Sequence, residues 1–235
     1  MITDGRGLTD IHTHILPGTD DGSASPEESL RLLSALSAQG VTTVAATPHF
    51  YAEQDNPAAF FSRRQEALAL LKSLPVPDIR ILPGAEVLLY PGISRTEQLP
   101  RFAIGDTSLL LLEMPFSDWM ASEVAEVVSI VRERKLQVVL AHIDRYLTRK
   151  NIRYLLELRQ TDVLFQVNAD AFLNRKTKKA ALDLLADGMV QFIGSDCHNM
   201  TSRPPRLSEA YGVIEGKFGK RPLEWLAEQS AMYFD

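Results

Sequence analysis

The chain has 235 residues, of which 45% are apolar and 23% are charged, and its formal net charge is -5 at pH 7. This apolar content is too high for a disordered chain and suffices for the core of one larger globular domain, so we expect a single domain over residues 1–235. With 25 basic and 30 acidic residues and no long basic run, the composition argues against a nucleic-acid-coating protein and against an anionic-membrane binder.

Cysteine usage and apolar patterning indicate the compartment. Cys197 is the single cysteine, which excludes an intramolecular disulfide. The first residues, MITDGRGLTD, lack the basic and then apolar layout of a signal peptide. No apolar stretch approaches the roughly 18 residues that a membrane span needs. We therefore expect a cytoplasmic protein that inserts no segment into a membrane.

Short apolar runs rich in β-branched residues alternate with longer amphipathic segments, a pattern that predicts strands followed by helices. The predicted strands, in chain order, are Leu8–His12, Val41–Thr47, Ile79–Glu86, Ser108–Glu113, Gln137–His142, Asp162–Asn168 and Val190–Asp196. Strands joined by helices pair in parallel, because a parallel pair needs a crossover connection. Seven of them predict an α/β fold, namely a distorted TIM-like (β/α) barrel.

The helices between these strands have recognisable ends. Ser25 is the expected N-cap of the first helix, Pro26 its first residue and Gly40 its stop. Asn56-Pro57 opens the second helix, and Leu74-Pro75 closes it. Further helices are expected at about 120–134, 151–159, 175–187, 205–217 and 222–231.

Histidines and acidic residues gather at the C-terminal ends of the predicted strands, which is the rim that carries the active site in such barrels. All five histidines lie there, together with three acidic residues: His12, His14, His49, His142, His198, Glu86, Glu113 and Asp196. A single histidine or glutamate at a strand end is usually a hydrogen-bonding loop residue. The whole set at one rim indicates a functional site.

The spacing of these residues predicts metal ligation. His12 and His14 are two residues apart, so their imidazoles lie on one side of a strand and can reach one metal ion, and Asp196 and His198 repeat this spacing. With Asp21 the set comprises nine nitrogen and oxygen ligands. One ion cannot use nine ligands and keep a position open for substrate, so we expect a cluster of two or three ions. Mixed imidazole and carboxylate ligands suit Mn, Fe, Zn or Co.

Longer motifs now resemble a known family. DIHTHILPGTDDG at 10–22, TPH at 47–49, GAE at 84–86, LLLLEM at 109–114, AHIDRY at 141–146 and SDCHNMTSRPP at 195–205 follow one another in the order of the polymerase-and-histidinol-phosphatase (PHP) family. More narrowly, the sequence is similar to the bacterial metal-dependent protein-tyrosine phosphatases of capsule and exopolysaccharide clusters. The resemblance extends to about residue 219, and the tail after Lys220 lacks the usual ending.

The resemblance implies a distorted (β/α)7 barrel that holds three divalent ions, commonly manganese. Carried over position by position, it implies three ligand groups: His12, His14, Glu86 and Asp196 on one ion, Glu86 with Glu113 and His142 on a second, and Asp21, His49 and His198 on the third. The family spacing selects Asp21 over Asp20, and Asp144 stands where relatives often have Glu. The implied partner is a phosphotyrosyl protein, the tail of a capsule-assembly tyrosine autokinase.

Charge counting supports a phosphorylated substrate independently. Three divalent ions and four ligand carboxylates leave a positive pocket in an acidic protein. Arg145 and Arg203 follow the predicted ligands His142 and His198 closely, and each can present a planar guanidinium to phosphate oxygens, although either is also a candidate for a surface ion pair. We expect direct hydrolysis by a hydroxide, formed from water whose pKa the ions lower. Both arginines would stabilise the transferred phosphoryl group.

Aromatic residues near the predicted ligands can either flank a phenyl ring or pack the loops. They are Phe50, Tyr51, Trp119 and Tyr146. Tyrosinate is a moderately good leaving group, and we assign no general acid.

Several alternatives remain at this point. The nearest is a PHP phosphoesterase of a small molecule such as histidinol phosphate, which has the same metal site. An amidohydrolase barrel needs a metal-bridging Lys at a strand end, and no predicted strand ends in Lys. A non-catalytic scaffold conflicts with nine filled ligand positions, and a nuclease conflicts with the missing basic track.

One coincidence suggests a different phosphatase chemistry. Cys197 and Arg203 match the C-x5-R signature of cysteine-dependent tyrosine phosphatases. That mechanism needs a low-pKa thiolate in a loop whose backbone N–H groups hold phosphate. Here the segment between them contains no glycine, and strand alternation points Cys197 away from Asp196 and His198. We therefore expect Cys197 to pack between barrel and helices.

Overall fold

A computed structural model of the chain describes residues 7–234. Its strands are β1 (Leu8–Thr13), β2 (Val41–Ala46), β3 (His49–Phe50), β4 (Arg80–Pro83), β5 (Glu86–Leu88), β6 (Leu109–Glu113), β7 (Gln137–Leu140), β8 (Leu164–Asn168) and β9 (Phe192–Gly194). Every pair between them is parallel, as predicted. The expectation about a signal peptide rests partly on residues 1–6, which lie outside the described residues.

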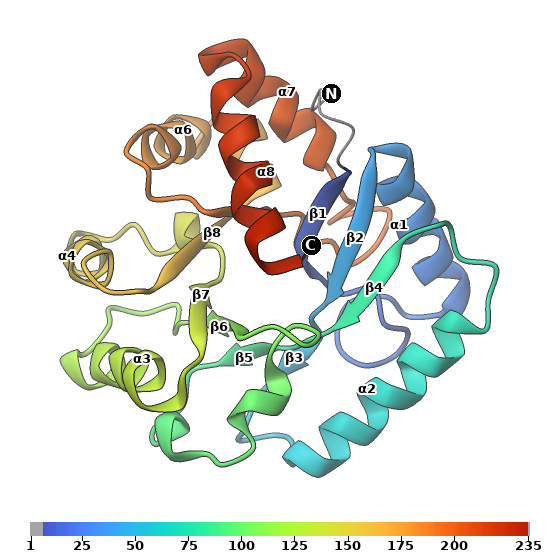
Figure 1. The fold of residues 1–235 in the computed structure, drawn as a ribbon, viewed down its shortest axis with the longest axis horizontal. Coiled ribbons are helices and arrows are strands. Elements are labelled where there is room, and N and C mark those ends of the chain that lie inside the picture. Colours follow the sequence, from blue (N-terminus) through green and yellow to red (C-terminus); the bar gives the residue numbers. More distant parts are fainter. Residues whose placement is uncertain (1–6, 235) are drawn as a thin grey trace.

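The strands curl into a distorted barrel, and helices surround it (Figure 1). A three-stranded sheet has the order β1-β2-β4, and a six-stranded sheet has the order β3-β5-β6-β7-β8-β9. The first and last strands meet where Asp196 N–H donates to His12 O at 2.8 Å and His14 N–H donates to Cys197 O at 2.9 Å. The Asp10 carboxylate, buried beside this seam, accepts from Ser195 N–H at 2.9 Å. The predicted α/β barrel is confirmed.

The predicted strand Ile79–Glu86 is wrong as one element. It is divided into β4, which pairs with β2, and β5, which pairs with the short β3. Gly84 and Ala85 carry the chain from one sheet to the other, and Gly84 N–H donates to Ala46 O at 2.8 Å. Hydrophobic periodicity does not reveal this step, because the apolar residues continue from one piece into the other along the sequence.

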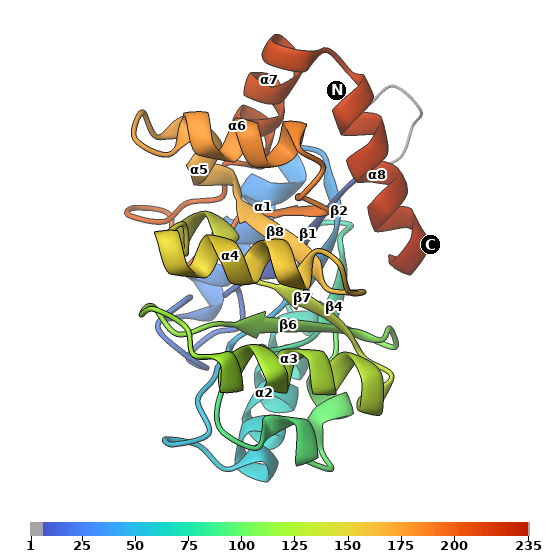
Figure 2. The ribbon, with the colours of Figure 1, turned by 90° about the vertical axis from the view of Figure 1, so that its left-hand side faces the viewer.

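The long helices lie where the sequence predicts them (Figure 2). They are α1 (Pro26–Ala38), α2 (Pro57–Lys72), α3 (Ala121–Arg134), α4 (Arg149–Leu158), α6 (Lys178–Ala186), α7 (Leu207–Phe218) and α8 (Arg221–Phe234). Ser25 and Asn56 cap α1 and α2 through their side chains, as expected. The five-residue α5 (Ala169–Leu173) was not predicted, because it is too short for a helical pattern. Between residues 7 and 234, no helix has both the length and the apolar character for crossing a bilayer.

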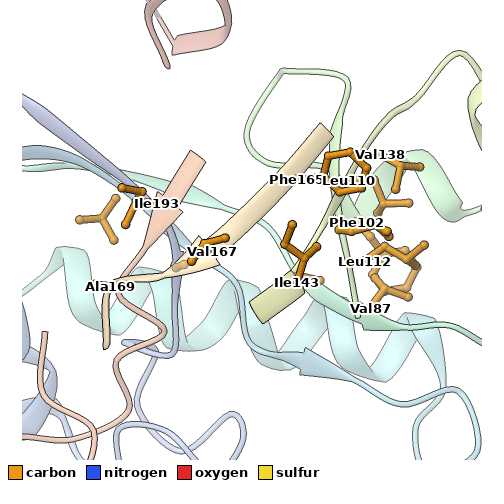
Figure 3. Close-up of a cluster of buried hydrophobic side chains, with 14 of the residues drawn as sticks. Val87, Phe102, Leu110, Leu112, Val138, Ile143, Phe165, Val167, Ala169 and Ile193 are labelled. Atoms are coloured by element: carbon orange, nitrogen blue, oxygen red, sulfur yellow. The ribbon is translucent and has the colours of Figure 1, made fainter. Parts of the chain in front are cut away.

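Strand alternation divides the core into two layers. Leu110 and Leu112 of β6 face the surrounding helices in the cluster shown in Figure 3, whereas Leu109 and Leu111 face the barrel interior. Phe234 at the end of α8 belongs to the interior cluster. The same alternation places Glu113, two residues after Leu111, on the interior side at the rim. The packing of the barrel thus positions a ligand candidate.

Candidate metal centre

The structure brings all nine predicted ligands together at the C-terminal rim. Their donor atoms form four overlapping groups within 4.8 Å: His14, Asp21, His49 and His198; His12, His14 and Asp196; His12, Glu86 and His142; and His49, Glu86 and Glu113. Three histidines, His12, His14 and His49, therefore each belong to two groups, whereas the motif-based assignment gave each of them one.

His12 and His14 each direct one ring nitrogen toward a common position. Their Nε2 atoms are 3.2 Å apart. His12 Nδ1 faces Gln166 Oε1 at 3.2 Å, and His14 Nδ1 faces Asp20 Oδ2 at 2.6 Å. Both Nδ1 atoms face acceptors, so the two Nε2 atoms are the ones placed to serve as ligands of a single cation. A cation at that position satisfies both lone pairs.

Glu86 lies at the centre of the cluster. Its Oε2 atom is 3.1 Å from His12 Nε2, 3.3 Å from His14 Nε2 and 3.1 Å from His49 Nδ1, yet it makes no hydrogen bond. Its Oε1 atom is 2.7 Å from His142 Nε2. A fully buried carboxylate between four imidazoles is suited to bridge two ions, because each oxygen faces a different part of the set.

The group formed by His14, Asp21, His49 and His198 lies at the mouth of the site. Asp21 is 67% exposed at its side chain, and its Oδ1 atom is 3.4 Å from both His49 Nε2 and His198 Nε2. His198 Nδ1 donates to the Asp196 carbonyl at 3.0 Å, so its Nε2 is left without a hydrogen bond. This group is the part of the cluster most open to an entering substrate.

Unusual backbone conformations aim two of these residues into the site. His142 and Asp196 have φ angles of 35° and 52°, in the left-handed region that residues other than glycine rarely adopt. Gly22 of the DDG motif has a steric role, because a Cβ there would lie 2.4 Å from His14 Cβ. Strain and close approach concentrate where the ligand candidates meet.

The electrostatics of the cluster fit cations. Burial acts to raise the pKa of Glu86, but His12 and its neighbours hold that pKa well below its usual value, so the buried carboxylate stays ionised. Burial acts to lower the pKa of His142, and hydrogen bonding to Glu113 and Glu86 instead raises it to about 9. Buried polar atoms of His49, Glu86, His142 and His198 have no hydrogen-bond partner. Imidazole and carboxylate donors with such orphaned atoms are a suitable set for divalent ions.

Three residues that orient the ligands were missed or only partly recognised. Asp20, left without a ligand role by the family spacing, holds His14 and also accepts from His49 N–H at 2.9 Å. Gln166 Oε1 accepts from His142 N–H at 2.6 Å, and its Nε2 donates to Asn168 Oδ1 at 2.8 Å. Asn168 in turn donates to Asp196 Oδ2 at 2.8 Å. The sequence Gln166-Val167-Asn168 at the end of β8 predicts only a strand by its pattern. Polar residues on a buried strand do indicate, however, that a polar group inside the barrel needs hydrogen-bond partners.

Gln166→Leu is expected to weaken metal binding about 10- to 100-fold while the protein stays folded. The substitution removes the acceptor for both His12 Nδ1–H and His142 N–H, and such orienting partners contribute this much to metal affinity. Isothermal titration calorimetry with the metal ion measures the change in affinity, and circular dichroism checks that the variant is folded. Unchanged affinity would show that β8 does not orient the ligands.

Arg145 and Arg203 converge on one oxygen. Each Nη2 lies 2.7 Å from Asp196 Oδ2, and their side chains are 34% and 33% exposed. Asp196 Oδ1 remains toward the histidines, 3.4 Å from His14 Nε2. Asp196 thus links the two arginines to the ligand candidates, and each arginine keeps further N–H donors that a bound anion could use.

For most of the aromatic residues near the ligands, the structure favours packing over flanking a substrate ring. Phe50 packs in the core against Phe60 and Phe102. Trp119 and Tyr146 are also buried, with exposed fractions of 0% and 1%. Tyr51 alone stays accessible, stacked on His49 with ring centroids 5.0 Å apart. It lines a cleft of about 460 Å³ together with Thr19, Asp20, Asp21, His49, Gln54, Asp55 and Arg63. An aromatic residue that is close to a ligand in the sequence therefore need not point its side chain into the site.

The structure does not support a cysteine nucleophile. Cys197 is fully buried in the layer between barrel and helices, as expected, and burial raises its pKa to about 12. The backbone N–H groups of Thr201, Ser202 and Arg203 donate to Asn199 Oδ1, so they are not free to hold a phosphate group. Neither a thiolate nor a phosphate-holding loop is present between Cys197 and Arg203.

Cys197→Ser is accordingly expected to retain most of its hydrolytic activity, and iodoacetamide is expected to inactivate the wild-type protein slowly if at all. Side-by-side rates of the two proteins, with and without chelator, provide the measurement. Complete loss of activity in folded Cys197→Ser, with chelator harmless, contradicts the metal-centre account.

Relatives of known activity match over nearly the whole chain. The chain is 29% identical to the tyrosine-protein phosphatase YwqE of Bacillus subtilis over 96% of this chain and 91% of that protein. It is 30% identical to the tyrosine-protein phosphatase CpsB of Streptococcus agalactiae, with 95% and 96% covered.

Solved structures agree with this relationship. A structure from work on YwqE and on CpsB of Streptococcus pneumoniae, described as unique metal-dependent tyrosine phosphatases, matches with a TM-score of 0.81 at 27% identity, covering 94% of this chain and 92% of that one. The histidinol phosphate phosphatase of Lactococcus lactis shares the fold at a TM-score of 0.56 and 18% identity, covering 88% of this chain and 92% of that one.

The family profile for capsular polysaccharide synthesis, CpsB/CapC, matches residues 8–233. The expectation that the likeness stops near residue 219 is therefore wrong, since the match continues through α8. The motif-based resemblance is confirmed, and the chain belongs to the CpsB/CapC family of capsular polysaccharide synthesis.

Proposed function

We propose that this protein is a metal-dependent protein-tyrosine phosphatase that hydrolyses phosphotyrosine in a protein of capsule or exopolysaccharide synthesis. The observation that carries the proposal is the convergence of nine imidazole and carboxylate ligands with two arginines at one barrel rim. Membership in a family with tyrosine phosphatases supports the substrate class.

In this proposal the nine residues hold three divalent ions, with manganese favoured and Fe, Zn or Co as alternatives. The overlapping groups around Glu86 and His14 support a cluster over a single ion. When bound, such ions supply Lewis acidity and lower the pKa of water so that a nucleophile exists at neutral pH.

The residues of the chain bind and orient the phosphoryl group. Arg145 and Arg203, held by Asp196, direct their remaining N–H donors at non-bridging phosphate oxygens and stabilise the charge on the transferred group. Asn168 keeps Asp196 in place by donating to the same oxygen that the arginines contact. Tyrosinate leaves without an assigned general acid, which its pKa near 10 makes feasible.

The proposed partner is the tyrosine-rich tail of a capsule-assembly autokinase, and the proposed location is the cytoplasm. No nucleic acid is expected as a partner, because the chain has a net charge of -5 and no long basic run. The single cysteine needs no oxidising compartment, since burial keeps Cys197 as a protonated thiol.

The test compares kcat/KM for a phosphotyrosyl peptide with kcat/KM for histidinol phosphate, using protein loaded with manganese. We expect the peptide to be preferred by at least about tenfold, which corresponds to about 1.4 kcal/mol. A preference for histidinol phosphate makes the protein a small-molecule phosphoesterase. Inactivity on both substrates, with metal bound, favours a metal-stabilised scaffold.

A further inference from the structure

Phe116 is an exposed aromatic residue at the mouth of the metal centre. It lies three residues after Glu113, and its side chain is 64% exposed. Its ring is nearly parallel to the imidazole of His142, at an interplanar angle of 16° and a centroid distance of 5.9 Å. His142 Nε2 in turn lies 2.7 Å from Glu86 Oε1. Phe116 thus stands one ring away from the central carboxylate.

The loop that carries Phe116 is firmly anchored. Trp119 is fully buried, its backbone N–H donates to Asn151 Oδ1 at 2.8 Å, and its indole N–H donates to Pro115 O at 3.1 Å. Asn151 Nδ2 donates to Ser117 O at 3.0 Å, on the other side of Phe116. Met114 N–H donates to the Tyr146 hydroxyl at 3.2 Å. These bonds hold the loop on both sides of Phe116, so its exposure is a built feature of the loop.

What distinguishes Phe116 from other exposed apolar residues is its place beside a metal-ligand candidate, where its ring offers a fixed apolar surface to a bound ligand. The ring of Phe116 lies beside His142 and Tyr146, with centroid distances of 5.9 Å and 5.6 Å, and much of its surface is open to solvent. A second ring can therefore pack on it in an offset or edge-to-face arrangement at the usual centroid separation of about 4.5–7 Å. Such a ring would adjoin a phosphate held at the metal centre.

We propose that Phe116 is a specificity-determining residue that packs against the phenyl ring of the substrate and selects aryl over alkyl phosphate monoesters. The inference rests on the proposed function and adds how the enzyme distinguishes phosphotyrosine from phosphoserine. An alkyl ester offers no ring to Phe116, so it gains nothing from this contact. Both classes of ester use the same arginines and metal ligands.

The test uses Phe116→Ala with a matched set of substrates. For a phosphotyrosyl peptide, kcat/KM is expected to fall about five- to tenfold, and for the corresponding phosphoserine peptide it is expected to change by less than about twofold. Phe116→Tyr, which keeps the ring, is expected to restore the wild-type ratio. Met120→Ala, at a 58% exposed apolar residue at the end of the same loop, is the control and should leave both rates unchanged.

Binding provides a second readout that does not depend on turnover. By calorimetry, Phe116→Ala is expected to weaken phenylphosphonate about five- to tenfold and to leave methylphosphonate unchanged. Equal losses for both ligands, an unchanged aryl preference, or the same ring-selective loss in Met120→Ala overturn the inference. A ring-selective loss in Tyr51→Ala instead places the substrate ring over His49 and also overturns it. Wild-type protein without any aryl preference contradicts the proposed function itself.

Discussion

His142→Ala is expected to lose bound metal and hydrolysis together while the barrel stays folded. The imidazole contacts both Glu86 and Glu113, at 2.7 Å and 3.4 Å, so its removal opens the group of ligand candidates around Glu86. Residues that only orient a ligand contribute about 10- to 100-fold in metal affinity or activity, so we expect a ligand deletion to cost at least about a hundredfold in kcat/KM. Elemental analysis and phosphotyrosyl-peptide kinetics on the same preparation measure both effects.

The fold should survive because apolar burial stabilises a chain of this length. Both layers of the core, inside the barrel and beneath the helices, consist of apolar side chains and include none of the nine ligand candidates. Thermal unfolding of the variant and of chelated wild-type protein is the control. Wild-type activity in His142→Ala, or undiminished turnover in excess chelator, ends the metal hypothesis.

Arg145→Lys and Arg203→Lys are each expected to lower kcat/KM about tenfold or more, or about 1.4 kcal/mol. Lysine keeps the charge but loses the planar fork with which each arginine contacts Asp196 and, in the proposed function, also binds phosphate. Because both arginines contact Asp196 Oδ2, their effects should not be additive in the double variant.

Arg206→Lys is the matched control for both variants. Arg206 is 38% exposed, similar to Arg145 and Arg203, but it pairs with Glu209 and Asp170 and not with a ligand candidate. Its replacement should leave the kinetics unchanged. Wild-type kinetics in Arg145→Lys and Arg203→Lys would show that these two arginines form only surface ion pairs and do not bind the substrate.

Periodicity and spacing predicted the features of this protein that depend on short stretches of sequence. Ser25 and Asn56 cap their helices because capping needs only a side chain and the next backbone N–H groups. His12 and His14 converge because strand alternation places residues two apart on one face. The rim position of the nine ligand candidates follows from the parallel order of the strands.

Features that depend on the path of the loops were not predictable in this way. The left-handed backbone at His142 and Asp196 has no signature in these residue types. Gln166 joins His12 to His142 across the barrel, a contact between residues far apart in the chain. Trp119 points into the core and Phe116 points out, although both lie in one loop, because hydrogen bonds to Asn151 and Pro115 fix the Trp119 end.

Elemental analysis of protein purified without chelator, combined with a phosphotyrosyl-peptide assay, tests the central claim most directly. The account predicts about three divalent ions per chain, loss of turnover when chelator removes them, and recovery when manganese is added back. Protein that contains less than one ion per chain and hydrolyses the peptide at full rate in chelator would contradict it.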